Sequence, residues 1–217
     1  MAQMKSKKFV GLYEKYLGLN NLVVGCGVGD EIKNLATFFP SSNFVGIDIE
    51  IAIAESEGNW QTIYMDAQKL NFQPGDFDFV YCHHVLEHVS DPQIVLGQIN
   101  LVLKPQGFAF VGTPNKNRTL GYFSSDASLV DKLKWNFDDL SRKFTGKFEN
   151  RYGAHAGFTA IEMREMLDKH FLEVNDVTFQ YYINLYPKYH LILRLLHLLK
   201  LANFIFPSIY FTCGAPR

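Results

Sequence analysis

The sequence predicts an α/β fold in which a doubly wound, largely parallel sheet is covered by helices on both faces. Between residues 21 and 113, short apolar runs rich in β-branched residues alternate with helical segments, a pattern typical of parallel strands buried on both sides. The chain has 217 residues, of which 47% are hydrophobic and 20% charged. This composition is that of one well-packed unit, so we treat residues 1–217 as a single domain.

Five apolar runs in the first half of the chain are predicted to be strands. They cover residues 21–25, 43–48, 60–65, 77–82 and 108–112. Because the carboxyl ends of parallel strands meet at one edge of an open sheet, residues that follow these runs are expected to share a crevice there.

Two helix starts carry capping signals. Ser90-Asp-Pro-Gln93 combines a capping box with a proline in the first turn, and the apolar stripe that it opens ends before Lys104-Pro105-Gln-Gly107. Thr159-Ala-Ile-Glu162 is a second capping box. The apolar residues expected on one face of its helix are Ile161, Met163, Met166 and Leu167.

The segment 114–156 is both polar and aromatic and contains glycine and proline breakers. It follows the carboxyl end of the fifth strand, where open α/β sheets bind ligands, so we expect a lid over a substrate. Beyond it, the sequence predicts a helix over 159–169, a strand over about 171–183, an apolar helix over about 188–203 and a last strand over about 206–213. The domain thus divides into a first half (about 20–113), the lid and a C-terminal part (157–217).

Charge and cysteine content exclude some classes of protein. The chain has 21 Lys and Arg against 22 Asp and Glu, a net charge of −1, which lacks the global attraction of a non-specific nucleic-acid binder. We therefore expect no nucleic acid and favour a small-molecule or protein partner. Cys26, Cys82 and Cys213 form no CxxC motif, and the chain starts without a secretory apolar run. These features predict a reduced, cytoplasmic protein.

The first strand is followed by a loop with glycine at alternate positions, Val23-Val-Gly-Cys-Gly-Val-Gly29. Glycine lets the chain turn tightly and lets a ligand approach the backbone. Asp30 breaks the dinucleotide fingerprint, and no Gly-Lys-Ser/Thr follows for a phosphate loop. Asp48 ends the second strand, where a carboxylate can accept hydrogen bonds from both ribose hydroxyls, and Asp66 follows the third. A tight turn with Asp48 as a helix cap is the alternative interpretation.

In their order and spacing, five segments resemble the class I S-adenosylmethionine-dependent methyltransferases, in particular the group with the ubiquinone-biosynthesis O-methyltransferases. They are VVGCGVG, VGIDIE, MDAQKL, FDFVYCHHVLEHVSDP and LKPQGFAFVGTPN, covering residues 20–115, with a weaker match over 155–180. The resemblance implies a Rossmann-like, seven-stranded sheet with an antiparallel last strand. It also implies S-adenosylmethionine as cofactor, S-adenosylhomocysteine as product, and cofactor contacts from Gly25, Cys26, Gly27, Asp48, Ile49, Asp66, Ala67, Cys82 and His83.

A histidine cluster, His83-His84-Val-Leu-Glu87-His88, follows the fourth strand. Its H-x-x-E-H pattern is that of a zinc peptidase, but the required helix is missing from this context. Quinone-biosynthesis relatives carry an E-x-x-E-H magnesium motif here. His84 replaces its first carboxylate and suits a hard ion less well, so we assign no metal, and metal binding by His84, Glu87 and His88 stays an alternative. Imidazole titrates near neutrality and can serve as a base. We expect the base to be His88, His84 or His155, in that order, with a hydrogen-bonded turn as the alternative.

Further polar and aromatic residues near the lid are candidates for binding the methyl acceptor. Asn115 and Arg118 follow the fifth strand and could bind a polar or anionic group, although an Asn turn explains them equally well. Tyr152 and Phe158 close the lid segment. Aromatic residues also concentrate from residue 122 onward, so we expect an acceptor with an apolar or aromatic portion.

From Val177 to Arg217 the chain contains no Asp or Glu. His190, Arg194 and His197 form a polar stripe on an otherwise aliphatic helix, which is interrupted too often by charge to span a membrane. The helix could pack on the domain or another subunit, line an acceptor pocket, or lie in a membrane interface. A peripheral membrane contact and a homo-oligomer through this helix therefore both stay open.

The resulting functional hypothesis is transfer of a methyl group from S-adenosylmethionine to a small molecule. In-line displacement needs alignment and, for a hydroxyl, a base. A hydroxyl oxygen is preferred because the resemblance is to O-methyltransferases and because histidines are available. The alternatives are a small-molecule N-methyltransferase and a non-catalytic S-adenosylmethionine-binding regulatory or partner protein. The Asp/Asn-Pro-Pro-Tyr signature of amide and nucleobase methylation is missing after the fourth strand.

Overall fold

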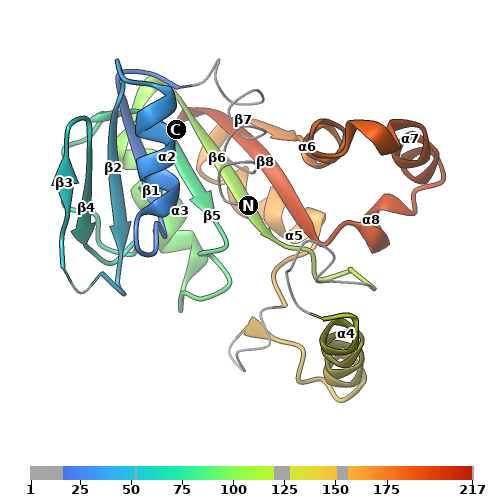
Figure 1. Cartoon of the computed structure of the whole chain (residues 1–217). Helices are drawn as coiled ribbons and strands as arrows, with labels where there is room; N and C mark the ends of the chain where they lie inside the picture. Colours follow the sequence, from blue (N-terminus) through green and yellow to red (C-terminus); the bar gives the residue numbers. More distant parts are fainter. Residues whose placement is uncertain (1–16, 52, 120–127, 151–155, 217) are drawn as a thin grey trace.

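The computed structural model describes residues 17–51, 53–119, 128–150 and 156–216. Its strands form a single eight-stranded sheet in the order β3-β4-β2-β1-β5-β6-β8-β7 (Figure 1). The strands are β1 Asn20–Val24, β2 Asn43–Asp48, β3 Ser56–Glu57, β4 Trp60–Tyr64, β5 Phe77–His83, β6 Leu103–Pro114, β7 Phe171–Asp176 and β8 Ser208–Pro216. The helices are α2 Asp30–Phe38, α3 Pro92–Val102, α4 Leu129–Phe144, α5 Ala160–Leu167, α6 Thr178–Leu185, η3 Pro187–Tyr189, α7 His190–Leu198 and α8 Ala202–Ile205.

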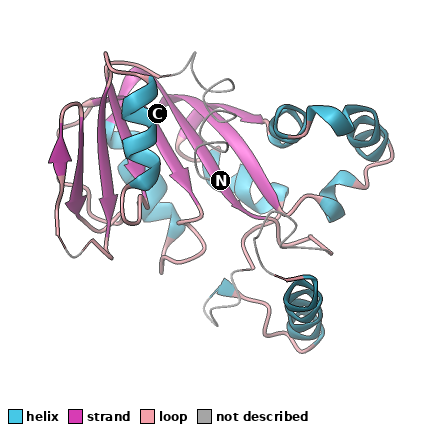
Figure 2. Ribbon diagram, in the orientation of Figure 1, coloured by secondary structure: helices cyan, strands magenta, loops and turns pink. Residues whose placement is uncertain are grey.

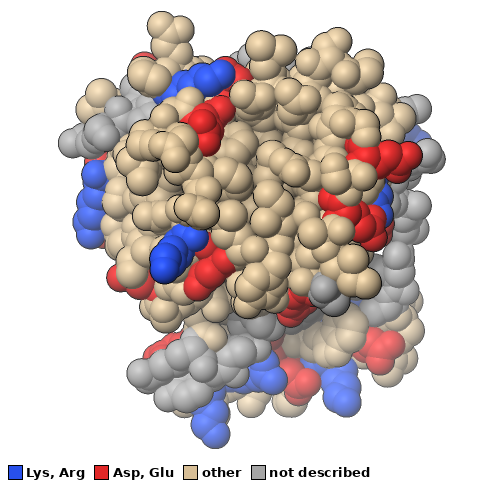
Figure 3. All heavy atoms as spheres, turned by 90° about the vertical axis from the view of Figure 1, so that its left-hand side faces the viewer, with Lys and Arg blue, Asp and Glu red and all other residues tan. Residues whose placement is uncertain are grey.

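The direction of the strands confirms the predicted fold class. β4, β2, β1, β5 and β6 run parallel, whereas β8 is antiparallel to both of its neighbours, β6 and β7. The two-residue β3 adds an eighth, antiparallel strand at the β4 edge. On the face of the molecule at this edge, acidic and basic side chains are interspersed (Figure 3).

Two hydrophobic cores lie on opposite faces of the sheet, because successive residues of a strand point to opposite sides. In β5, Val80 and Cys82 join the core under α3 and α5, whereas Phe79 and Tyr81 join the core under α2, α6, α7 and α8. The ribbon in Figure 2 shows helices on both sides of the sheet. Burial on both faces of the sheet thus explains the near-continuous apolar runs in the sequence.

The two predicted helix caps had different outcomes. Thr159 forms the predicted capping box with Glu162, but Ile161 is 72% exposed and does not share the buried face with Met163. At α3 the predicted cap is wrong by one residue. The Asp91 side chain accepts a hydrogen bond from Gln93 N and caps the helix, and Ser90 Oγ instead donates to Gln68.

The predicted strand over 171–183 is wrong in its second half, because β7 ends at Asp176 and a helix follows. Asp176 Oδ1 accepts a hydrogen bond from Thr178 N, which turns the chain. The Thr178 hydroxyl then takes over the pairing with β8: it donates to Tyr210 O and accepts from Tyr210 N. One helical turn later, Tyr182 is buried in the core.

The predicted apolar helix over 188–203 is broken into α7 and α8. Lys200 has φ 58, and Lys200 N and Leu201 N donate to His197 O and Leu196 O. This is the hydrogen-bond pattern of a Schellman motif, which ends a helix with one left-handed residue. In the part of the chain that the structure describes, no helix has the length and apolar character needed to cross a membrane.

The predicted lid segment contains α4, whose N-cap Ser128 accepts a hydrogen bond from Asp131 N. Figure 1 shows this helix beyond the carboxyl ends of the parallel strands. That the segment closes over a substrate stays a prediction.

Candidate active site

The loop between β1 and α2 has the open backbone that a ligand needs. Gly25 and Gly27 have φ 73 and φ 54, in the left-handed region that favours glycine. A Cβ on Gly27 would meet nothing within 4 Å, so its backbone borders open space, whereas a Cβ on Gly25 would lie 2.3 Å from Val85 Cγ2. Gly25 N and Cys26 N donate to Ile47 O at 2.9 and 3.1 Å, which ties the loop to β2.

Asp48 connects this loop to the end of β2. Its Oδ2 accepts a hydrogen bond from Gly27 N at 2.8 Å, and its Oδ1 accepts one from Glu50 N at 2.9 Å. A carboxylate oxygen can accept two hydrogen bonds, so the half-buried Asp48 retains capacity on each oxygen for a ribose hydroxyl. The sequence prediction for Asp48 is compatible with this geometry.

The remaining predicted nucleoside contacts lie at the ends of β2 and β4. Ile49 is largely exposed and offers an apolar face, Ala67 is buried, and the exposed Asp66 accepts a hydrogen bond from Gln68 N through Oδ1. An open glycine backbone, a strand-end carboxylate and an exposed aliphatic side chain fit the methionine, ribose and adenine portions of S-adenosylmethionine.

Two of the predicted cofactor residues are cysteines, and their thiols are buried to different degrees. Cys82 is completely buried in the core beneath α3, because its position in β5 points away from the side of Tyr81. The cofactor contact predicted for it is therefore corrected: Cys82 is a core residue with no exposed surface. Burial, reinforced by the charge of Asp48, raises the pKa of Cys26 to about 12, so this thiol stays protonated at neutral pH.

His83 belongs to a stack of aromatic rings on the α2 side of the sheet. Its ring lies 5.6 Å from that of Tyr210 and 5.7 Å from that of Tyr81. Gly112 makes the stack fit, because a Cβ there would come within 2.6 Å of His83 and 2.8 Å of Tyr210. The His84 ring is 4.0 Å from that of His83, so the stack reaches the end of β5.

Glu87 is the centre of the histidine cluster. Its side chain is 1% exposed; Oε1 lies 3.0 Å from His84 Nδ1 and 3.9 Å from His88 Nε2, and Oε2 accepts from Thr113 Oγ1 at 3.2 Å. His84 Nε2 lies 3.4 Å from Ser208 Oγ. The sequence did not reveal Thr113 and Ser208 as neighbours, since both come from strands distant in the chain.

His84 is held in an uncommon backbone conformation. Its φ of 56 is in the left-handed region, where a non-glycine residue costs on the order of 1 kcal/mol. Its backbone N–H donates to Gly112 O, and its ring contacts Glu87. His88 is half-exposed and more distant from the carboxylate, so the geometry favours His84 over His88, reversing the predicted order. Among the described residues, no three His, Cys, Asp or Glu side chains gather as metal ligands.

Asn115 has a structural role rather than the predicted contact with an acceptor. Its buried amide donates to Asn203 O at 2.7 Å and Phe206 O at 2.9 Å, and its Oδ1 accepts from Asn117 N. These bonds attach the loop after β6 to α8. The half-buried Phe158 forms an isolated parallel bridge with Asn115 and packs against the core. Tyr152 and His155 lie outside the described residues.

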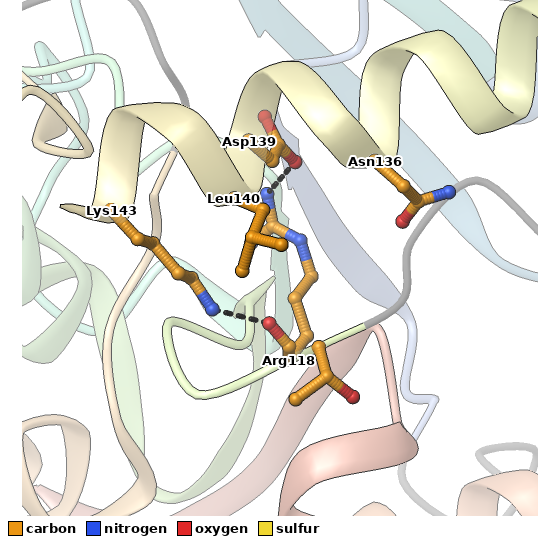
Figure 4. A pocket seen from close by; sticks show the side chains of 6 residues that line it. Arg118, Asn136, Asp139, Leu140 and Lys143 are labelled. Carbon is orange, nitrogen blue, oxygen red and sulfur yellow. Dashed lines mark hydrogen bonds and ion pairs between the residues drawn. The ribbon is translucent and has the colours of Figure 1, made fainter. Parts of the chain in front are cut away.

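Arg118 also has its donors engaged by the protein. The guanidinium is buried and donates to Asn115 O, Ala156 O and Asp139 Oδ2, while Lys143 of α4 donates to the Arg118 carbonyl (Figure 4). The small pocket around it is lined by Arg118, Thr119, Asn136, Asp139, Leu140 and Lys143. Arg118 therefore fastens α4 to the sheet, and we omit it from the proposed acceptor site.

Replacing Arg118 by methionine is expected to lower the free energy of unfolding by about 3 kcal/mol, because it leaves Asp139 as a buried carboxylate without its ion pair. Urea denaturation measures the change. Hydrogen–deuterium exchange over α4 tests whether the helix detaches first.

The matched control is Lys116→Met, which breaks the more exposed ion pair with Glu162 in the same loop and is expected to cost less than about 1 kcal/mol. Equal effects of the two substitutions would contradict an anchoring role for Arg118.

Comparison with known sequences identifies the domain. Residues 22–111 match the family described as a methyltransferase domain. The ubiquinone biosynthesis O-methyltransferase of Pseudomonas aeruginosa is 28% identical over 184 residues, which are 76% of this chain and 77% of that protein. The enzyme of the same name from Colwellia psychrerythraea is 35% identical over 104 residues, 43% of this chain and 41% of that protein.

Solved structures show the same fold at low identity. The plantazolicin methyltransferase BpumL in complex with a desmethylplantazolicin analogue and S-adenosylhomocysteine superposes with a TM-score of 0.61 at 15% identity, covering 100% of this chain and 85% of that one. Phosphoethanolamine N-methyltransferase 2 of Haemonchus contortus gives a TM-score of 0.57 at 16% identity, covering 97% and 53%. The matched methyltransferase domain and these relatives show that the chain is a class I S-adenosylmethionine-dependent methyltransferase, and the solved structures share its fold.

Proposed function

We propose that this methyltransferase methylates a hydroxyl group of a small molecule with an apolar or aromatic body, using His84 as the base and Glu87 as the residue that orients it. The observation that carries the proposal is the 3.0 Å contact between His84 Nδ1 and the buried Glu87 carboxylate at the end of β5. When bound, S-adenosylmethionine supplies an electrophilic methyl group. Transfer from a sulfonium requires alignment and removal of the hydroxyl proton.

The carboxylate determines what His84 can do. When Nδ1–H donates to Glu87, the ring is in the tautomer whose Nε2 carries a lone pair, so Nε2 can accept the proton of the acceptor hydroxyl. The negative charge of Glu87 then stabilises the imidazolium that forms. Ser208 Oγ, at 3.4 Å from Nε2, makes only a long contact that an acceptor hydroxyl can replace.

The aromatic stack supports an acceptor with an aromatic or apolar portion. His83 is its half-buried end, and behind it Tyr210 and Phe110 continue the stack, with ring centroids 5.5 Å apart. Such a stack is rigid and apolar, and offset aromatic contacts favour flat ligands. The side chains of Asn115 and Arg118 donate to other groups of the protein, so we do not assign them to an anionic acceptor. This supports an uncharged acceptor.

The experiment is methyl transfer from isotopically labelled S-adenosylmethionine to a panel of phenols and alcohols, with matched anilines and amines as competitors. We expect S-adenosylhomocysteine and a labelled methyl ether from hydroxyl acceptors. Methyl groups found only on nitrogen would replace the proposal by N-methylation. Cofactor binding without transfer to any acceptor would favour the non-catalytic alternative.

Replacing Glu87 by glutamine is expected to lower kcat by about 100-fold, because the neutral amide neither fixes the His84 tautomer nor stabilises the imidazolium. The KM for S-adenosylmethionine is expected to stay within about twofold. Steady-state kinetics separates the two parameters.

Glu173→Gln, an exposed carboxylate on β7, is the matched control and should leave kcat unchanged. A Glu87→Gln variant that changes KM and kcat together would point to a structural role.

A further inference from the structure

We propose that α7 and α8 form a membrane-docking surface that binds anionic lipid headgroups and inserts its aliphatic side chains into the interface. The surface consists of five exposed side chains of α7 and its C-cap, together with Leu201 and Phe204. The five are Leu191, Ile192, Leu195, Leu198 and Leu199, which are between 55% and 78% exposed. The inference does not depend on the identity of the methyl acceptor.

The spacing of these five residues places them on one face of the helix. Positions i, i+1, i+4, i+7 and i+8 form an apolar stripe in an α-helix. On the opposite face, Leu193 is buried in the core, and the His197 ring stacks on Phe179 at 4.1 Å. The helix is therefore attached to the domain by a narrow face, and its wider apolar face is turned toward solvent.

The charges around the stripe favour an anionic partner. Arg194 lies three residues after Leu191 and four before Leu198, which places it at the border of the stripe. Lys188 and Lys200 lie at the two ends of α7, and all three cations are exposed. No Asp or Glu occurs from residue 177 to 217, so the aliphatic surface has only cationic neighbours within its own segment.

This combination distinguishes a membrane from other partners. Two copies packed through the stripe would bring the same cations together without acidic counterparts within the segment, which disfavours self-association. An interfacial helix with aliphatic residues on one face and Lys or Arg beside them binds by insertion of the apolar face and by attraction to anionic lipids. The nine residues of α7 are too few to span a bilayer, but an interfacial helix needs no such length.

The segment that contains α7 and α8 is also connected to the proposed acceptor site. β8 begins at Ser208, shortly after α8, and Ser208 N and O are hydrogen-bonded to the Tyr182 hydroxyl of α6. Figure 1 shows α6, α7 and α8 as one lobe beside the β7–β8 edge of the sheet. Docking through this lobe would bring a membrane close to the end of β8 that carries Ser208.

Vesicle flotation of the full chain tests the proposal, with vesicles of phosphatidylcholine alone or with added phosphatidylglycerol. We expect binding to anionic vesicles at least about tenfold above neutral ones at low salt, with a decrease as salt is raised. Leu195→Gln combined with Leu198→Gln should reduce binding by at least about tenfold. Arg194→Gln combined with Lys200→Gln should reduce binding to anionic vesicles only.

The matched control is Ile161→Gln combined with Leu172→Gln, two exposed aliphatic residues on α5 and β7, which should bind vesicles like the wild type. Circular dichroism checks that each variant is folded. The proposal would be overturned by a lack of binding to either vesicle or by equal losses in the control. A dimer in sedimentation that Leu195→Gln and Leu198→Gln dissociate would instead assign the stripe to a second copy of the chain.

Discussion

The His84→Asn variant is expected to lose at least about 100-fold in kcat for methyl transfer to a hydroxyl while binding S-adenosylmethionine normally, the size of effect typical of removing a general base. Asparagine is chosen because it tolerates the left-handed backbone of this position, where φ is 56. The loss should come from the missing Nε2 lone pair and not from a distorted turn. Release of S-adenosylhomocysteine gives kcat, and calorimetry gives the affinity for the cofactor.

The His88→Asn variant is the matched control from the same turn. His88 Nε2 is 3.9 Å from the Glu87 carboxylate and its side chain is half-exposed, so we expect less than about fivefold loss in kcat. A larger loss in His88→Asn than in His84→Asn would transfer the role of base to His88. Partial recovery of the His84→Asn variant by added imidazole would support proton removal as the missing function.

The strands of the first half could be predicted because burial on both faces leaves a direct mark on the sequence. In β5 both Val80 and Tyr81 must be apolar, since one faces each core. The end of β7 could not be predicted in the same way. The residues after Asp176 are as apolar as a strand, and the chain turns there because the Thr178 hydroxyl pairs with the backbone of Tyr210 in β8.

The residues of the candidate site likewise divide into those that the sequence could predict and those that it could not. Asp48 and Asp66 could be predicted at one edge of the sheet because they lie at or just after the carboxyl ends of β2 and β4, which are paired in parallel. The roles of Asn115 and Arg118 could not, since a polar residue after a strand has the same pattern whether its partner is a ligand or the protein. Here the partners are Asn203 and Asp139, which only the tertiary structure brings near.

Replacing Asp48 by alanine is expected to weaken the binding of S-adenosylmethionine by about 100-fold. Two hydrogen bonds from ribose hydroxyls to a carboxylate contribute about 3 kcal/mol together, and each 1.4 kcal/mol is a factor of ten in affinity. The substitution also removes the acceptor of Gly27 N, which lies 2.8 Å from Asp48 Oδ2. Calorimetric titration with S-adenosylmethionine and S-adenosylhomocysteine measures the loss, and thermal unfolding shows whether the loop change has weakened the fold.

A ligand without ribose hydroxyls separates these two contributions. The wild type should bind the 2′,3′-dideoxy analogue of S-adenosylhomocysteine much more weakly than S-adenosylhomocysteine itself, because Asp48 loses both partners. In Asp48→Ala the two ligands should bind within about threefold of each other, since the contact that distinguishes them is gone. If the variant still prefers the hydroxylated ligand as strongly as the wild type, the ribose is bound elsewhere, and the weakened affinity reflects only the glycine loop. Equal binding of the two ligands by the wild type would remove Asp48 from the nucleoside site altogether.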